Sequence, residues 1–134
     1  MKQPNDVGSN KDLALYRVET AKDDLRAANI LLNADEYRGA NNRAYYAIFH
    51  AINAVHALNG ISYKRHKDAI GNFNKEYVKN EVFPRELGRS ISEAEEIRHA
   101  SDYDDFYIAN KDEAKELIET AEKLIALVEK YIGR

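Results

Sequence analysis

Apolar residues recur along most of the chain at the three- and four-residue spacing that is typical of amphipathic helices. No segment sustains the two-residue alternation of a half-buried strand, and only two prolines and six glycines are present to interrupt helices. The pattern therefore predicts an all-α chain. The apolar stripes occupy residues 14–32, 44–58, 66–77, 87–98 and 114–132.

These stripes predict four long helices and one shorter helix. We expect the first helix from about Lys11 to Leu32, the second from Asn41 to Asn59, and the shorter third helix from about His66. Pro84 suits the first turn of the fourth helix, and Asn110, with a glutamate three residues later, resembles a capping box at the start of the fifth. Because short connections favour antiparallel neighbours, the predicted architecture is an up-and-down antiparallel bundle of four long helices.

The N-terminal segment is polar and lacks the apolar stretch of a secretory signal peptide. We expect residues 1–10 to form a flexible tail and residues 11–134 to form a single domain, since a chain of this length can bury a core. The prediction is a cytoplasmic protein.

The second predicted helix is unusual because residues 44–59 contain no Lys, Arg, Asp or Glu, although these make up 32% of the chain. About 20 apolar residues are needed to cross a bilayer, and this run is shorter and interrupted by polar residues, so we expect no membrane span. One stripe of the helix is apolar, whereas a neighbouring stripe is polar and needs hydrogen-bond partners if it is buried. The polar stripe comprises Arg43, Tyr46, His50 and Asn53.

Arg98 occupies an apolar position of the fourth helix, because Leu87, Ile91, Ala94 and Arg98 step by four, three and four residues. A buried arginine must be paired or must line a cavity, and Asp102 lies four residues further along the same face. One interpretation is a structural ion pair. The other is a guanidinium that is held by Asp102 and offered to a phosphate group.

Together, the polar stripe and Arg98 would form an anion pocket between helices that binds a nucleotide or RNA. The predicted phosphate-binding residues are Arg43, Tyr46, His50, Asn53, Arg98 and Asp102. A histidine ring titrates near neutral pH, so His50 is the best-placed acid or base, although a neutral core histidine is the structural alternative.

Composition narrows the chemistry further. The formal net charge is -3 with both signs interleaved, which argues against a general grip on DNA and leaves only local contacts with RNA or a nucleotide. The chain has no cysteine, no pair of histidines four residues apart, no HExxH motif and no glycine-rich phosphate loop. We therefore predict no metal site and no cofactor.

Four segments in this order and spacing resemble the higher eukaryotes and prokaryotes nucleotide-binding (HEPN) domains, in particular their small stand-alone prokaryotic branch. The resemblance implies a helical bundle that often forms a homodimer. It also implies a partnership with a small nucleotidyltransferase encoded nearby, in toxin–antitoxin or defence-type pairs. The segments are NRAYYAIFHA at Asn42–Ala51, RHKDAIGNF at Arg65–Phe73, ELGRSISEAEEIR at Glu86–Arg98 and ASDYDDFY at Ala100–Tyr107.

Many proteins of the wider family are metal-independent ribonucleases that use an arginine followed, after four to six residues, by a histidine. Arg98 matches that arginine, but residues 103–105 are Tyr, Asp and Asp, so the histidine is absent. Carboxylates repel an RNA phosphate, and a phenol, which ionises near pH 10, is a poor base at about pH 7. We expect the nuclease activity to be lost unless His50 supplies the base. The resemblance also implies Tyr103 and Tyr107 as acceptors for a nucleotide attached by the partner enzyme.

Three functions follow as alternatives. The first is a binding module for a nucleotide, RNA or a partner nucleotidyltransferase. The second is a ribonuclease toxin with Arg98 and His50 as its catalytic pair. The third is a homodimeric assembly protein without a ligand.

Overall fold

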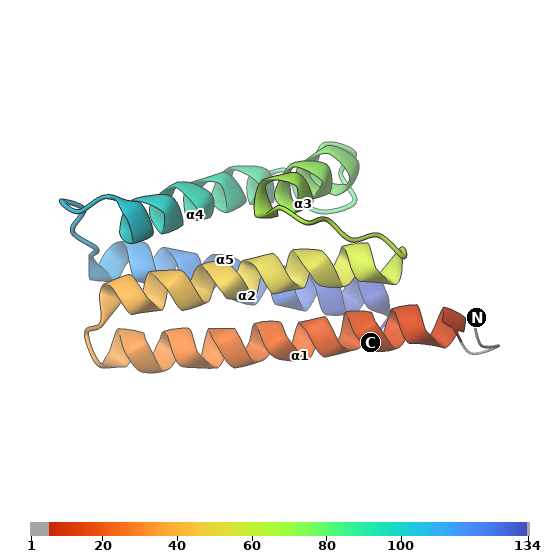
Figure 1. Ribbon diagram of the computed structural model, residues 1–134, viewed down its shortest axis with the longest axis horizontal. Helices are drawn as coiled ribbons and strands as arrows, with labels where there is room; N and C mark the ends of the chain where they lie inside the picture. The colour runs from red at the N-terminus through yellow and green to blue at the C-terminus, as the bar shows by residue number, and fades with distance from the viewer. Residues whose placement is uncertain (1–5, 134) are drawn as a thin grey trace.

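The computed structural model describes residues 6–133, and this part of the chain consists of helices and connecting segments (Figure 1). α1 begins at Asp6 rather than at the expected Lys11, so residues 6–10 are helical, whereas residues 1–5 lie outside the described part. A π-helical turn, η1, extends α3. The elements are α1 (Asp6–Asn33), α2 (Tyr37–Leu58), α3 (His66–Phe73), η1 (Asn74–Val78), α4 (Glu86–Tyr103) and α5 (Lys111–Ile132).

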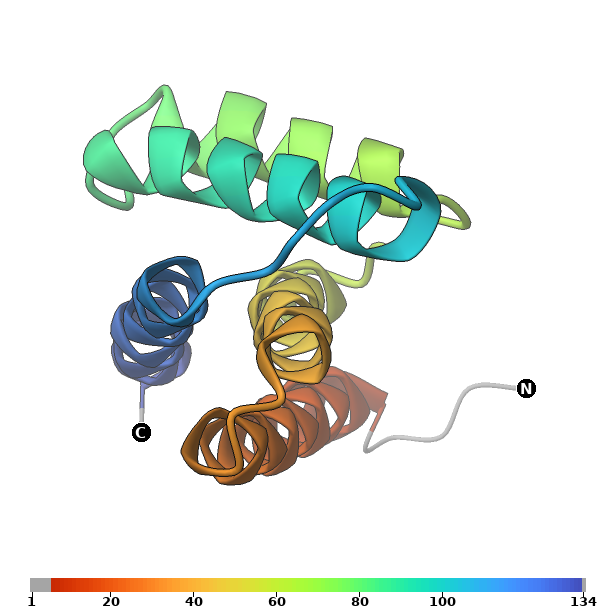
Figure 2. The ribbon, with the colours of Figure 1, turned by 90° about the vertical axis from the view of Figure 1, so that its left-hand side faces the viewer.

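The helices form two layers (Figure 2). α1, α2 and α5 run along the long axis, and α3 and α4 lie across one side of α2 and α5. α2 contacts each of the other four α-helices, so it is the central helix of the bundle. The all-α prediction, with four long helices and a shorter third, is confirmed.

The absence of charge in the middle of α2 follows from this central position. Its apolar stripe is buried and its polar stripe is half-buried, because α1 packs against it from below, α5 from one side, and α3 and α4 from above. Small side chains allow those neighbours to approach closely. The fully buried alanines of α2 are Ala40, Ala44, Ala47, Ala51 and Ala54. Within residues 6–133, no helix is long and apolar enough to cross a membrane.

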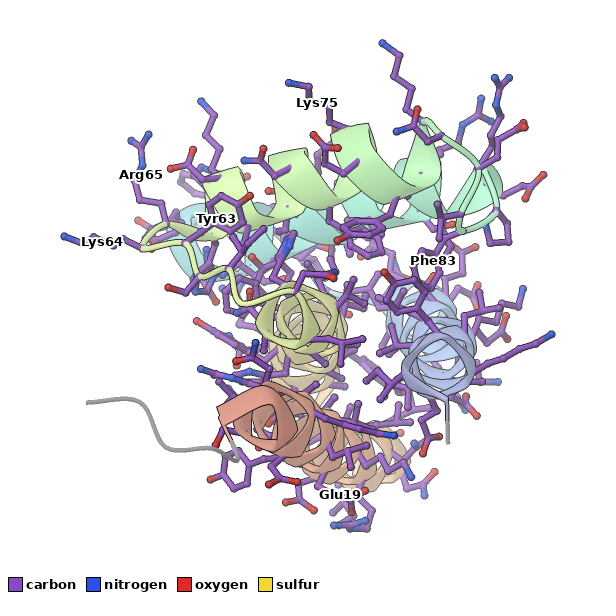
Figure 3. All side chains as sticks on the ribbon, turned by 90° about the vertical axis from the view of Figure 1, so that its right-hand side faces the viewer. Glu19, Tyr63, Lys64, Arg65, Lys75 and Phe83 are labelled. Atoms are coloured by element: carbon purple, nitrogen blue, oxygen red, sulfur yellow. The ribbon has the colours of Figure 1, made fainter. Side chains whose placement is uncertain are left out.

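Local signals place the remaining boundaries. The side chain of Asn110 accepts a hydrogen bond from the backbone N–H of Glu113 at 2.9 Å, as the capping pattern predicted. α5 ends at Ile132 and is followed by Gly133, whose φ of 94° is readily adopted by glycine. Before α4, the buried Phe83 packs against Phe73 and Tyr131, which ties the α3–α4 layer to α5 (Figure 3).

Candidate functional site

Arg98 projects from α4 toward the tyrosines of α2. Its Nη2 donates to the hydroxyl of Tyr46 at 3.4 Å, and its Nε lies 3.0 Å from Oδ2 of Asp102. The predicted pairing of Arg98 with Asp102 is therefore present. The Nε–H of Arg98 has no hydrogen-bond partner among the described residues, so this contact is an ion pair without an aligned hydrogen bond. The guanidinium retains donor capacity.

Aromatic rings surround the Arg98 guanidinium. Its central carbon lies 5.2 Å from the ring centroid of Tyr45 and 5.9 Å from those of Tyr46 and Tyr103. A cation is attracted to the faces of such rings, which holds the group in place without using its N–H donors. The side chain of Arg98 remains 22% exposed, so solvent or a ligand can reach it.

Arg43 and His50 lie against α1, where Asp24 joins them. Oδ1 of Asp24 accepts a hydrogen bond from Nη1 of Arg43 at 2.8 Å, and Oδ2 lies 3.5 Å from Nε2 of His50. Arg43 also donates from Nε and Nη2 to Oδ1 of Asn42. Most of the Arg43 donors are thus engaged within the protein, and the carboxylate that organises them was not predicted.

The surroundings of His50 favour its neutral form. Burial lowers the pKa of His50 most strongly, and the charges of Arg17 and Arg43 lower it further, whereas Asp24 raises it. Nδ1 of His50 is buried and has no hydrogen-bond partner in the described part of the chain. The ring is therefore a candidate base, held between α1 and α2.

Tyr46 separates the two halves of the predicted pocket. Its ring centroid lies 5.0 Å from the guanidinium carbon of Arg43 and 6.1 Å from the centroid of His50, while its hydroxyl contacts Arg98. Asn53 is half-buried further along α2, and no side-chain hydrogen bond within residues 6–133 joins it to these groups. The structure thus brings the predicted residues to two sides of one tyrosine rather than around one hollow.

His66, the first residue of α3, lines the same groove as Arg98. Its ring stacks on Phe49 with a centroid distance of 3.7 Å, and its Nδ1 lies 3.0 Å from the hydroxyl of Tyr45. Burial lowers the pKa of His66, and the nearby charges of Arg98 and His50 lower it further. The sequence signal was its position at the start of the RHKDAIGNF segment.

A groove of about 620 Å³ runs between α3 and α4. Basic side chains and carboxylates both line this groove, so its charges are mixed. Burial raises the pKa of one of these carboxylates, Glu95. Perturbed acids and bases in one hollow are a common mark of functional sites. The lining residues with polar side chains include Tyr45, His66, Lys67, Glu95, Arg98 and His99.

The two predicted modification sites differ in accessibility. Tyr103 is 66% exposed at the end of α4. Tyr107 is half-buried and its hydroxyl donates to Glu113, and burial together with this bond raises the pKa of Tyr107 to about 12. Arg38, which sequence reasoning missed, donates to the backbone carbonyls of Tyr107 and Ser101 and so anchors this segment to α2.

Comparisons with known proteins agree with this fold. Residues 14–131 match the model of the HEPN domain. A Thermotoga maritima protein named UPF0332 protein is 31% identical over 87% of this chain and 89% of its own. Two Methanocaldococcus jannaschii proteins, each named "Putative toxin", are 30% and 34% identical over 86% of this chain and over 78% and 85% of their own lengths.

The crystal structure of TT1696 from Thermus thermophilus has the same fold. It aligns with a TM-score of 0.73 at 23% identity and covers 87% of this chain and 96% of that one. The family match spans all five α-helices, including the buried stripe of α2 and the Arg98 position of α4. The resemblance seen in the sequence is thereby confirmed, and the chain belongs to the HEPN domain family.

Proposed function

We propose that this protein is a binding module that takes the phosphate of a nucleotide or of RNA at Arg98. The observation that carries the proposal is the Arg98 guanidinium, which lines an open groove on a side chain that remains 22% exposed. Guanidinium groups bind phosphate oxygens through parallel N–H donors. Asp102, the competing carboxylate, is itself 27% exposed, so an incoming phosphate displaces only one partly hydrated partner.

The hollow between α4 and α5 is unsuited to a phosphate. It measures about 410 Å³. Carboxylates dominate its walls, and these repel anions. The acidic residues that line it are Glu86, Glu93, Glu116 and Glu119.

Isothermal titration calorimetry with AMP, ATP and a short single-stranded RNA tests the proposal. We expect binding by the wild type, loss of binding in Arg98→Ala, and unchanged binding in Arg89→Ala, which removes an exposed arginine from the same helix. Circular dichroism melts show whether each variant is folded. The proposal fails if the wild type binds none of these probes, or if Arg98→Ala is folded and binds like the wild type.

We further propose that the protein acts with a partner protein, in keeping with the toxin names of two relatives. The α4–α5 connection carries Phe106 and Ile108, which are 93% and 84% exposed, and exposed apolar side chains of this size favour protein contacts. A small nucleotidyltransferase is the partner that the HEPN resemblance implies. Sedimentation velocity distinguishes a complex with this partner from a homodimer of the protein. A monomer at every concentration would contradict the homodimer.

Tyr103 is the proposed acceptor if that partner transfers a nucleotide. Its hydroxyl belongs to an exposed side chain, whereas the hydroxyl of Tyr107 is engaged by Glu113. Incubation with the nucleotidyltransferase encoded nearby, ATP and Mg²⁺ should transfer AMP to the protein with release of pyrophosphate. Mass spectrometry detects the added nucleotidyl group. We expect Tyr103→Phe to abolish the addition and Tyr107→Phe to retain it, and the reverse result would assign the modification to Tyr107.

A metal-independent ribonuclease is the second candidate function. The observation that favours it is a pair of histidines, His50 and His66, whose rings both lie beside that of Tyr46, and His66 lines the groove with Arg98. Burial lowers the pKa of both histidines. A neutral imidazole accepts a proton from a ribose 2′-hydroxyl, and an arginine stabilises the charge that develops on the phosphate. At the position of the family's histidine, the carboxylate of Asp104 instead accepts a hydrogen bond from the backbone N–H of Phe106.

RNA incubated with the protein in EDTA decides this second candidate. Ribonuclease activity would leave 2′,3′-cyclic phosphate ends and would disappear in a folded His50→Ala variant. Intact RNA at high protein concentration would reject the ribonuclease and would leave the binding proposal to be judged by calorimetry.

A further inference from the structure

We propose that the groove between α3 and α4 binds a mononucleotide, with its phosphate held between His66 and Arg98 and with His66 acting as a hydrogen-bond donor. The inference rests on the proposed function and deepens it by naming the second phosphate ligand and the ligand class. His66 belongs to α3 and Arg98 to α4, so neither the polar stripe of α2 nor the family's histidine position contains this pair.

The hydroxyl of Tyr45 is a hydrogen-bond partner of His66. Tyr45 is only 2% exposed, and its hydroxyl lies 3.0 Å from Nδ1 of His66. In the proposed arrangement, this hydroxyl donates its proton to Nδ1 of His66. A neutral imidazole that accepts at Nδ1 carries its proton at Nε2. His66 therefore presents an N–H donor, which suits a phosphate oxygen.

The imidazole is held in one orientation before any ligand arrives. Its ring lies nearly parallel to Phe49, with an interplanar angle of 24°, and edge-on to Tyr46, at 83°. Fixing the ring in advance lowers the entropy cost of binding. Arg98 lines the same groove as His66, so an anion bound between them would interact favourably with both groups.

The start of α3 adds to the attraction for anions. Lys64, Arg65 and Lys67 surround the first turn, and Lys64 and Arg65 point away from the bundle (Figure 3). Positive charge at this end of a helix opposes the helix dipole, and Asp68, whose Oδ2 accepts from Nε of Arg65 at 3.1 Å, offsets only part of it. An anion bound in the neighbouring groove reduces that repulsion.

The carboxylates of the groove favour a mononucleotide over an RNA strand. Glu95 and Glu96 line the groove beside Arg98, and a long polyanion would pass close to them. A single nucleotide places its phosphate at His66 and Arg98, and its ribose hydroxyls can donate hydrogen bonds to the carboxylates, as they do to acidic residues in dinucleotide sites. The groove volume of about 620 Å³ is within the range of small-molecule sites.

Calorimetry with AMP, adenosine, inorganic phosphate and a short RNA tests the inference. We expect AMP and phosphate to bind, and His66→Ala to weaken AMP binding by roughly 10- to 100-fold, as for a lost hydrogen bond to a charged group. Arg89→Ala is the matched control and should bind AMP like the wild type. Nitrogen NMR of the wild type should show the His66 proton on Nε2 and a rise in the pKa of His66 when AMP is added.

The outcomes separate the two proposals. If a folded His66→Ala binds AMP like the wild type while Arg98→Ala does not, the inference fails and the proposed function stands. If RNA binds and AMP does not, the ligand class is wrong. If no phosphate-containing probe binds the wild type, both proposals fail. Should His66→Ala not fold, an unchanged His66 pKa in the presence of AMP overturns the inference in the wild type.

Discussion

Replacement of Asp24 by asparagine should weaken the contacts that α1 makes with Arg43 and His50 of α2. Asp24 is 13% exposed at its side chain and holds both Arg43 and His50 through its two carboxylate oxygens. Asparagine keeps the size of the side chain but removes the charge. The asparagine side chain can still accept one hydrogen bond from Arg43. The attraction of a negative charge for Arg43 and for the His50 ring is lost.

The expected loss of unfolding free energy depends on how deeply Asp24 and Arg43 are buried. A hydrogen bond to a charged group contributes about 1.5 to 3 kcal/mol, and removal of one partner from a fully buried ion pair costs about 3 to 5 kcal/mol. Arg43 is 38% exposed, so water partly replaces the lost carboxylate. We therefore expect a loss of about 1 to 2 kcal/mol, which in a domain of this size lowers Tm by roughly 4 to 8 °C.

Asp23→Asn provides the matched control, because Asp23 and its partner Arg26 are 68% and 69% exposed, and exposed pairs contribute little. Urea denaturation should show a change below about 0.5 kcal/mol for this variant. In Asp24→Asn, NMR titration should also find a lower pKa for His50, because Asp24 raises it in the wild type. Equal destabilisation by the two substitutions, or an unchanged pKa of His50, would refute the reasoning.

Three further predictions concern stability. Burial lowers the pKa of His56 below that of the unfolded chain, so the unfolded state takes up the proton first. The free energy of unfolding should therefore fall as pH drops below about 6.5, and urea titrations at several pH values should find a smaller slope in His56→Gln. Phe73→Ala should cost about 3 to 5 kcal/mol, because Phe73 is fully buried, whereas Phe106→Ala should leave the unfolding free energy nearly unchanged, since Phe106 is 93% exposed. Asn110→Ala should cost about 1 kcal/mol in the same assay, and Asn110→Ser, which keeps a capping oxygen, should cost less. A pH-independent stability, a harmless Phe73→Ala or an equal loss in both Asn110 variants would contradict the respective prediction.

The periodicity of the sequence was sufficient to predict the features that depend on one helix at a time. The stripe of α2, the cap at Asn110 and the pairing of Arg98 with Asp102 all involve residues within one or two turns of each other. Asp24 also left a sequence signal, because it lies three residues after Ala21 and four before Ala28, both fully buried. That spacing places it beside the core, although a pattern of apolar residues does not show what a carboxylate will contact.

The sequence by itself therefore determined the helices, their buried faces and the identity of Arg98 as an arginine in an apolar position. Only the tertiary structure decided which polar groups meet, because those contacts join residues far apart in the chain. Asp24 reaches Arg43 from another helix, Tyr45 bonds His66 across the α2–α3 connection, and Arg38 anchors Tyr107 across 69 residues. Side-chain periodicity reports the face of a helix, whereas the partner on the facing helix depends on how the helices cross and on their relative positions along the bundle.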